Sequence, residues 1–213
     1  MARRPFDDHD RHTLGDAVAY VESVSAVELV VVMRPAAPAW PHAGWLAGVA
    51  AAWAVLALLL FSPPAFRLWS FLLDPVLAGG VIGWLVHRFP GTARWITPRD
   101  TRRRLVQKAA EHAFLSRRVH DTRSRTGVLV YAAIADGLVT VIGDTGVLDV
   151  VTAGRLDGWR VRIEAALPQG PRAIAAALAA MAPVFAAALP RCHDDRNELP
   201  NLVDVLPADG ADA

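Results

Sequence analysis

Residues 45–61 read WLAGVAAAWAVLALLLF, an unbroken run of 17 residues without a charged side chain in a chain of 213. A helix needs about 17–25 predominantly apolar residues to cross the hydrocarbon core of a bilayer. Ser62-Pro63-Pro64 then ends the helix, because proline has no backbone N–H to donate and its ring clashes with the preceding turn. The run therefore predicts a membrane-spanning helix, around which the rest of the chain is organised.

A second apolar stretch, residues 66–86, reads FRLWSFLLDPVLAGGVIGWLV and completes a predicted helical hairpin. Each helix carries two glycines four residues apart, Gly44 with Gly48 and Gly79 with Gly83, which permit close approach of helices in lipid. The alternative is a hairpin buried inside a soluble protein. We prefer the membrane interpretation, because the flanking chain already offers enough helices and strands for a core of its own.

Asp74 interrupts the second stretch, next to Pro75. A carboxylate at the centre of a bilayer costs about 2.5–3.5 kcal/mol on insertion scales, so its position needs an explanation. One explanation is that Asp74 caps a shorter helix beginning at Pro75, with residues 66–73 lying along the membrane interface. The others are a paired functional carboxylate and an ion path in a small transport or channel subunit. The cap is the preferred interpretation.

Aromatic and basic residues flank the two stretches and predict how they lie in the membrane. The predicted interface residues are Trp45, Trp69, Trp84 and Arg88. Residues 87–125 carry eleven Lys and Arg against three Asp and Glu, whereas the turn offers only Arg67. The positive-inside rule then predicts two passes through a bacterial inner (plasma) membrane, with both termini cytoplasmic. The basic run favours anionic lipid headgroups as its partner over nucleic acid.

Composition excludes several classes of protein. With 54% hydrophobic residues the chain is too apolar for an ordinary soluble domain, and with 20% charged residues it is too polar for a many-pass membrane protein. A single cysteine, Cys192, cannot form an internal disulfide. The N-terminus is polar and no apolar segment follows its two arginines, so we expect no signal peptide.

The segments on either side of the hairpin predict the elements of one small α/β domain. The β-branched run 27–33 suits a strand covered on both faces, and Asp136-Gly137 is a strong signal for a hairpin turn. The predicted helices cover residues 12–23 (with Thr13 as N-cap), 98–119, 158–167 and 171–189 (with a break at Pro183), and the predicted strands cover residues 27–33, 127–134 and 138–142.

This order predicts an α/β fold with a mixed sheet, interrupted by an inserted two-helix transmembrane hairpin. Residues 1–38 and 98–206 form the two parts of the α/β domain, residues 39–97 form the hairpin, and residues 207–213 form a mobile tail. The interpretation requires the strand before the hairpin to pair with the strands after it.

Three residues, Asp144, Asn197 and Glu198, are the candidate polar site, and no residue is assigned as catalytic or as a metal ligand. Asp144 follows a predicted strand, where a carboxylate can hold a hard divalent cation or bond nearby backbone amides in a turn. The turn is the preferred interpretation. Residues 197–201, Asn-Glu-Leu-Pro-Asn, either present Asn197 and Glu198 beside the strand ends or form a rigid extended tail.

Four features together carry a resemblance to a known family: FLSRRVHDTRSRTGVLVY at 114–131, VTVIGDTGV at 139–147, Trp159, and NELPN at 197–201. The chain resembles the bacterial membrane branch of the TPM-domain proteins, small integral membrane proteins related to a thylakoid-lumen phosphatase-like protein. The resemblance implies a small α/β sandwich and a phosphatase activity. The residues themselves assign no cofactor; the resemblance implies Ca²⁺ or Mg²⁺, because related domains bind calcium through an acidic cluster.

The expected function is that of a binding or assembly module for other membrane proteins, anchored so that its TPM-like domain faces the cytoplasm. A strong anchor and the lack of a nucleotide-binding loop, HExxH or GxSxG motif favour this interpretation. The alternative is a metal-dependent phosphatase of the TPM type. Whether the chain is an enzyme is left open, and its expected partners are membrane lipids and other membrane proteins.

Overall fold

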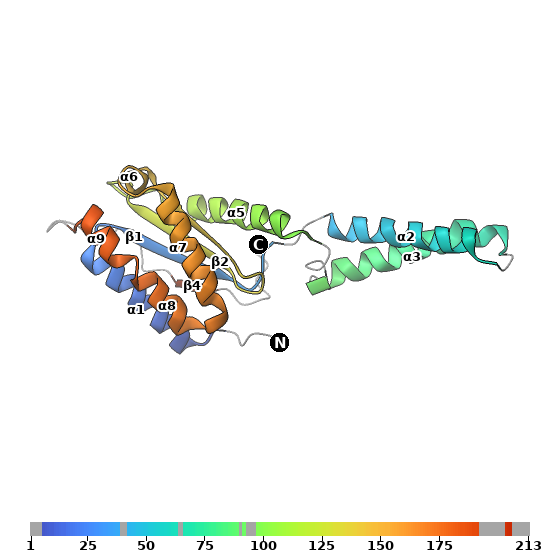
Figure 1. Ribbon diagram of the computed structural model, residues 1–213, viewed down its shortest axis with the longest axis horizontal. Helices are drawn as coiled ribbons and strands as arrows, with labels where there is room; N and C mark the ends of the chain where they lie inside the picture. Colours follow the sequence, from blue (N-terminus) through green and yellow to red (C-terminus); the bar gives the residue numbers. More distant parts are fainter. Residues whose placement is uncertain are drawn as a thin grey trace. The chain divides into compact units, whose positions relative to one another are not determined.

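A computed structural model of the protein describes residues 6–38, 42–63, 66–89, 91–92, 97–191 and 203–205, and these residues fall into two compact units (Figure 1). One unit joins residues 1–37 to residues 103–213 and holds a sheet with its helices. The other unit, residues 38–102, holds a pair of long helices. The first unit is therefore built from two parts of the chain that the second unit separates.

The sheet has four strands in the order β3-β2-β1-β4. Their bounds are β1 (Glu28–Arg34), β2 (Gly127–Ala133), β3 (Leu138–Gly143) and β4 (Val203–Val205). β1 runs parallel to β2 and to β4, whereas β2 and β3 are antiparallel. The strand before the helical pair thus joins the strands after it, which confirms an α/β fold with a mixed sheet.

Both faces of β1 are covered by helices, which explains its nearly continuous apolar sequence. Leu29, Val31 and Met33 lie in one core with α1 (Asp8–Val24), α7 (Ala153–Ala166), α8 (Pro171–Ala179) and α9 (Ala182–Ala188). Val30 and Val32 lie in a second core with α5 (Arg99–Ser116). The alternation of side chains along a strand divides the run between the two cores.

The first helix begins earlier than its apolar stripe indicates. Asp7 is the N-cap of α1: its Oδ1 accepts a hydrogen bond from the Asp10 backbone N–H at 2.8 Å, and Asp10 accepts one from the Asp7 N–H at 3.1 Å. The predicted N-cap, Thr13, is wrong, because its hydroxyl donates to the His9 carbonyl inside the helix. The reciprocal pair of carboxylates satisfies two backbone donors that a helix start leaves open.

The connection between β2 and β3 is the predicted turn. Gly137 adopts a φ of 62°, which favours glycine, and the Asp136 carboxylate accepts a hydrogen bond from the Ala37 N–H at 2.7 Å. Beyond β3 lies a short helix that the sequence did not predict, α6 (Thr145–Leu148). The predicted break at Pro183 is confirmed, because α8 and α9 are separate helices and Pro183 lies in the first turn of α9.

The short strand β4 was also not predicted. It pairs with β1 over Val31–Met33, and its central residue, Asp204, forms ion pairs with Arg34 and Arg117. These two arginines come from the end of β1 and from the segment after α5, so the ion pairs tie β4 to both. The predicted mobile tail, residues 207–213, lies outside the described residues.

The second unit is an antiparallel pair of helices, α2 (Ala43–Phe61) and α3 (Leu68–Arg88). Gly48 and Gly79 face each other, and backbone meets backbone there: a Cβ on Gly48 would lie 2.7 Å from the carbonyl oxygen of Gly79. One turn away, a Cβ on Gly44 would lie 3.0 Å from the carbonyl oxygen of Gly83. The four glycines thus permit the close approach that their spacing predicts.

α3 runs through Asp74-Pro75 without a break, so the predicted N-cap at Asp74 is wrong. The helix begins at Leu68, and Arg67 is its N-cap residue. Residues 68–73 therefore belong to the helix rather than to a separate segment along an interface. The physical reason is that half of them are leucines, which are good helix formers, and that one internal proline removes a single ladder hydrogen bond here without ending the helix.

Candidate functional site

The helical pair concentrates the apolar surface of the molecule. Within the described residues, the only exposed large hydrophobic side chains outside 45–89 are Tyr20, Leu115, Leu148, Val150 and Val161. Between Trp45 and Phe89, eighteen such side chains are exposed, and Phe61 reaches 89%. Water-soluble proteins rarely present a continuous apolar surface of this kind, which marks a contact with lipid or with another protein.

Length and hydropathy single out three helical segments in the described chain that are long and apolar enough to cross a membrane: α2, α3 and residues 171–188. The third segment comprises α8 and α9, and its residues Ile174, Leu178, Met181 and Phe185 lie in the core beside the sheet. By contrast, only 11% of the apolar window in α2 or in α3 is buried. Apart from a small cluster of Ala43 and Val86, most apolar residues of α2 and α3 therefore lie outside any core of the described residues.

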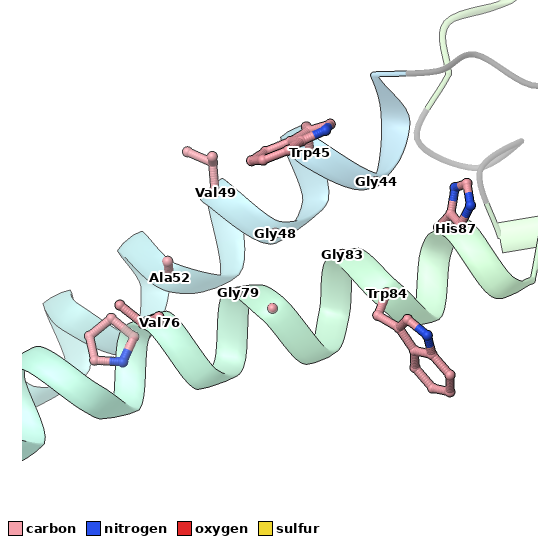
Figure 2. A pocket seen from close by; sticks show the side chains of 12 residues that line it. Gly44, Trp45, Gly48, Val49, Ala52, Val76, Gly79, Gly83, Trp84 and His87 are labelled. Carbon is pink, nitrogen blue, oxygen red and sulfur yellow. The ribbon is translucent and has the colours of Figure 1, made fainter.

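The tryptophans predicted at membrane interfaces lie toward the two ends of the helical pair. Trp45 and Trp84 belong to the same end, because Gly44 faces Gly83, whereas Trp69 lies near the turn. All three are more than 60% exposed, and Figure 2 shows Trp45 and Trp84 extending away from the contact between the helices. Arg88 lies 5.7 Å from the ring of Phe89 at the end of α3.

A groove of about 630 Å³ follows the contact between the two helices (Figure 2). It exists because glycines replace side chains along both helices, and its wall is mostly apolar. Its lining includes Gly48, Val49, Val76, Gly80, Trp84 and His87. Asp74 is not part of this lining.

Asp74 lies near the middle of the apolar length of the pair. The facing glycines set an antiparallel register that places Asp74 level with Trp53, which is about 15 Å of helix rise from Ala43 and about 12 Å from Phe61. The side chain is exposed and makes no hydrogen bond or ion pair within the described residues. The only charged group at this depth of the pair is thus left without a described partner.

Asp144, the first candidate from the sequence, is a buried capping residue. It is the N-cap of α6: its Oδ1 accepts a hydrogen bond from the Thr145 N–H at 2.7 Å, while its own N–H donates to the Gly127 carbonyl. Its Oδ2 is buried with no hydrogen-bond partner among the described residues. In the part of the chain that the structure describes, no three His, Cys, Asp or Glu side chains group so that they could hold a metal ion.

The other two candidates, Asn197 and Glu198, lie outside the described residues, as does the segment Cys192-His193-Asp194-Asp195. Their place beside the strand ends stays a prediction.

Sequence reasoning missed Glu22, which lies at the end of α1. Its Oε1 accepts a hydrogen bond from the Leu29 N–H at 3.1 Å, and its Oε2 is buried without a hydrogen-bond partner among the described residues. Burial raises the pKa of this carboxyl to about 7, and the negative charge of Glu28 adds to the rise. The Leu29 N–H needs this partner because β4 covers only Val31–Met33 on that edge of β1. The available signal was an acidic residue directly after the apolar stripe of α1.

Comparison with known proteins supports the fold. The sequence matches no protein-family model and no curated protein. The structure is similar to the NMR structure of the BA42 protein from the psychrophilic bacterium Bizionia argentinensis, with a TM-score of 0.57 and 16% sequence identity. The match covers 96% of this chain and 97% of that chain. At this level of identity the likeness shows a shared fold alone.

Proposed function

We propose that the chain is a two-pass protein of a bacterial inner membrane whose TPM-like α/β domain acts on the cytoplasmic side as a binding module for other membrane proteins. The observation that carries the proposal is the exposed apolar surface of α2 and α3. By their length, the two helices rise about 28 Å and 31 Å, close to the roughly 30 Å of a hydrocarbon core.

The energetics of insertion favour this arrangement. Leu, Ile, Phe and Val at the centre of a membrane helix each contribute about −0.3 to −0.6 kcal/mol, and α2 has no charged residue that opposes them. In α3 the cost of Asp74, about 2.5–3.5 kcal/mol, is offset by several such residues. Exposure of these side chains to water would instead favour aggregation.

The topology of the sheet supports two passes. β1 precedes the helical pair, β2 follows it, and the two strands are paired from Glu28 with Gly127 to Arg34 with Ala133. If the helical pair enters a membrane, this pairing favours the return of both of its ends to one side, which supports two crossings rather than one. The Lys and Arg residues after α3 support the cytoplasm as that side.

Among the described residues, no observation favours the metal-dependent phosphatase. Asp144 serves the start of α6 rather than a group of carboxylates. Other charged side chains of the domain are engaged in structural contacts, such as Arg160 with Glu164 at 2.9 Å. The binding-module interpretation instead relies on the exposed apolar side chains of α2 and α3.

Cysteine labelling in intact cells tests the proposal. Two variants, Ser62→Cys in the turn and Asp149→Cys in the exposed part of the domain, are made in a Cys192→Ser background. We expect a membrane-impermeant maleimide added to spheroplasts to label Ser62→Cys at once, and to label Asp149→Cys only after permeabilisation. The proposal is wrong if both sites label alike, or if the protein stays in the soluble fraction after ultracentrifugation.

A further inference from the structure

Because α3 is continuous, Asp74 is not a helix cap and lies near the middle of the length of the helical pair. A cap would have lain at a membrane interface, where water can solvate a carboxylate. In the observed helix, Asp74 lies level with the middle of α2, with apolar residues on both sides of it along the helix. If the helical pair spans a bilayer, as the proposed function holds, this carboxylate faces hydrocarbon and is costly to leave there without a partner.

The helical pair cannot supply a counter-charge from its own described residues. α2 contains no charged residue. Arg67, the N-cap of α3, lies about 10 Å of helix rise from Asp74 toward the turn, and His87 and Arg88 lie about 20 Å away toward the other end. Asp74 forms no ion pair or hydrogen bond with any described residue. Among the described residues, none can supply a counter-charge at this depth, which leaves another membrane protein as a source.

The position of Asp74 on α3 leaves it open to a third helix. Five residues separate it from Gly79, which is a rotation of about 140° around the helix, so Asp74 points away from α2. Ser70 and Ala78 lie one turn before and one turn after it on the same side, and their small side chains allow another helix to come close.

Charge complementarity selects the occupant of this face. A second copy of the chain would place another Asp74 at the same depth and no cation, so the two copies would repel each other there. Lipid headgroups are confined to the membrane surface. A lysine or arginine near the middle of another transmembrane helix has the opposite charge at the right depth, and its own burial in lipid is relieved by the pairing.

We infer that Asp74 is a docking residue within the membrane that binds a lysine or arginine at the centre of a transmembrane helix of a partner membrane protein. The inference rests on the proposed function and names the class of partner. The contact joins the carboxylate of Asp74 to the partner cation, while Ser70 and Ala78 allow the helix backbones to approach.

The test uses the full chain in phosphatidylcholine vesicles, with a fluorescent donor attached to Ser62→Cys in the Cys192→Ser background. The probes are acceptor-labelled host peptides of Leu and Ala that span the bilayer, with one central lysine or with norleucine in its place. We expect energy transfer to show about tenfold tighter association with the central lysine. Asp74→Asn should abolish this preference, whereas the matched control Leu77→Asn should retain it.

Three results would overturn the inference. They are equal association of both peptides, an unchanged preference in Asp74→Asn, and self-association of labelled copies that depends on Asp74, which would make a second copy the occupant. Flotation of the vesicles separates this failure from a failure of the proposed function. A chain that does not float with lipid contradicts the proposed function, whereas a chain that floats without a lysine preference contradicts only the inference.

Discussion

At the scale of single residues, Glu22 shows how an exposed strand edge is satisfied. β4 is too short to reach the Leu29 N–H, and the Glu22 carboxylate takes its place as the acceptor. The same burial disfavours the ionised carboxylate and raises the pKa of Glu22 from 4.5 to about 7. The stability of the domain thus depends on pH through one side chain that supports the sheet.

The sign of this dependence follows from the two pKa values. Below about pH 4.5 the carboxyl is protonated in both folded and unfolded chains, so its stabilising contribution is complete. Between about pH 4.5 and 7 the unfolded chain ionises first, and the free energy of unfolding falls. Over this pH range we expect the free energy of unfolding of the native chain to fall by about 1–2 kcal/mol more than that of Glu22→Gln. This figure allows for solvent screening of a partly buried group.

Urea unfolding of the detergent-solubilised chain at pH 4, 5.5, 7 and 8 measures this difference. Glu22→Gln keeps an acceptor for the Leu29 N–H and removes the titration, so it isolates the carboxyl from the other acidic groups. Parallel stability curves for the two proteins would show that burial of Glu22 does not shift its pKa.

At the scale of elements, the α2–α3 contact depends on which face of the helix each glycine occupies. Gly79 and Gly80 are neighbours, but a Cβ on Gly79 would lie 2.8 Å from the Gly48 carbonyl oxygen, whereas a Cβ on Gly80 meets nothing within 4 Å. The two positions therefore form a matched pair that separates helix packing from helix propensity.

We expect Gly79→Ala to destabilise the helical pair by about 1–3 kcal/mol, because the two backbones must move apart. Gly80→Ala should be neutral or stabilising by up to about 1 kcal/mol, because alanine is the better helix former. Titration of the micelle-bound protein with SDS, followed by tryptophan fluorescence, compares the two variants. Equal effects would contradict the assigned contact face.

Ion pairs hold the strand β4 in the sheet more than its few backbone hydrogen bonds do. With three residues it contributes few ladder hydrogen bonds, and Asp204 links it to Arg34 and Arg117. We expect Asp204→Asn to release β4 and to lower the free energy of unfolding by about 1–3 kcal/mol, since two partly buried guanidinium groups lose their anion.

Hydrogen exchange gives the local readout for this variant. Amides in residues 31–33 and 203–205 should exchange faster in Asp204→Asn, while those of the β2–β3 pair should not change. The exposed Asp149→Asn serves as the control for removal of one negative charge. Unchanged exchange in residues 203–205 would mean that the ion pairs do not hold the strand.

At the scale of the whole molecule, long patterned segments were predictable and short ones were not. A sequence pattern that extends over many residues is easy to recognise. Such patterns occur in the apolar runs of β1, β2 and α2 and in the glycine spacing of the helical pair. β4 and α6 are too short to show a period, and α3 overrides the local effect of Pro75. The partner of Glu22 depends on where β4 stops, which is a property of the folded sheet and not of any local pattern.

The candidate site, too, has parts that could be predicted from the sequence and parts that could not. The apolar surface and its flanking tryptophans follow from composition, and the structure exposes them. A hydrogen bond from a nearby backbone amide to Asp144 was one of two open interpretations, and the bond from the Thr145 N–H supports it. Asn197 and Glu198 lie outside the described residues, so their place beside the sheet stays a prediction.

The parallel pairing of Glu28 with Gly127 also has a consequence for how the protein is made. At about 5–20 residues per second, a ribosome needs about 5–20 s to go from the first of these residues to the second. During that interval the first strand has left the ribosome without its neighbour, and both long helices are synthesised before that neighbour appears. The sheet therefore closes only after both long helices have been synthesised.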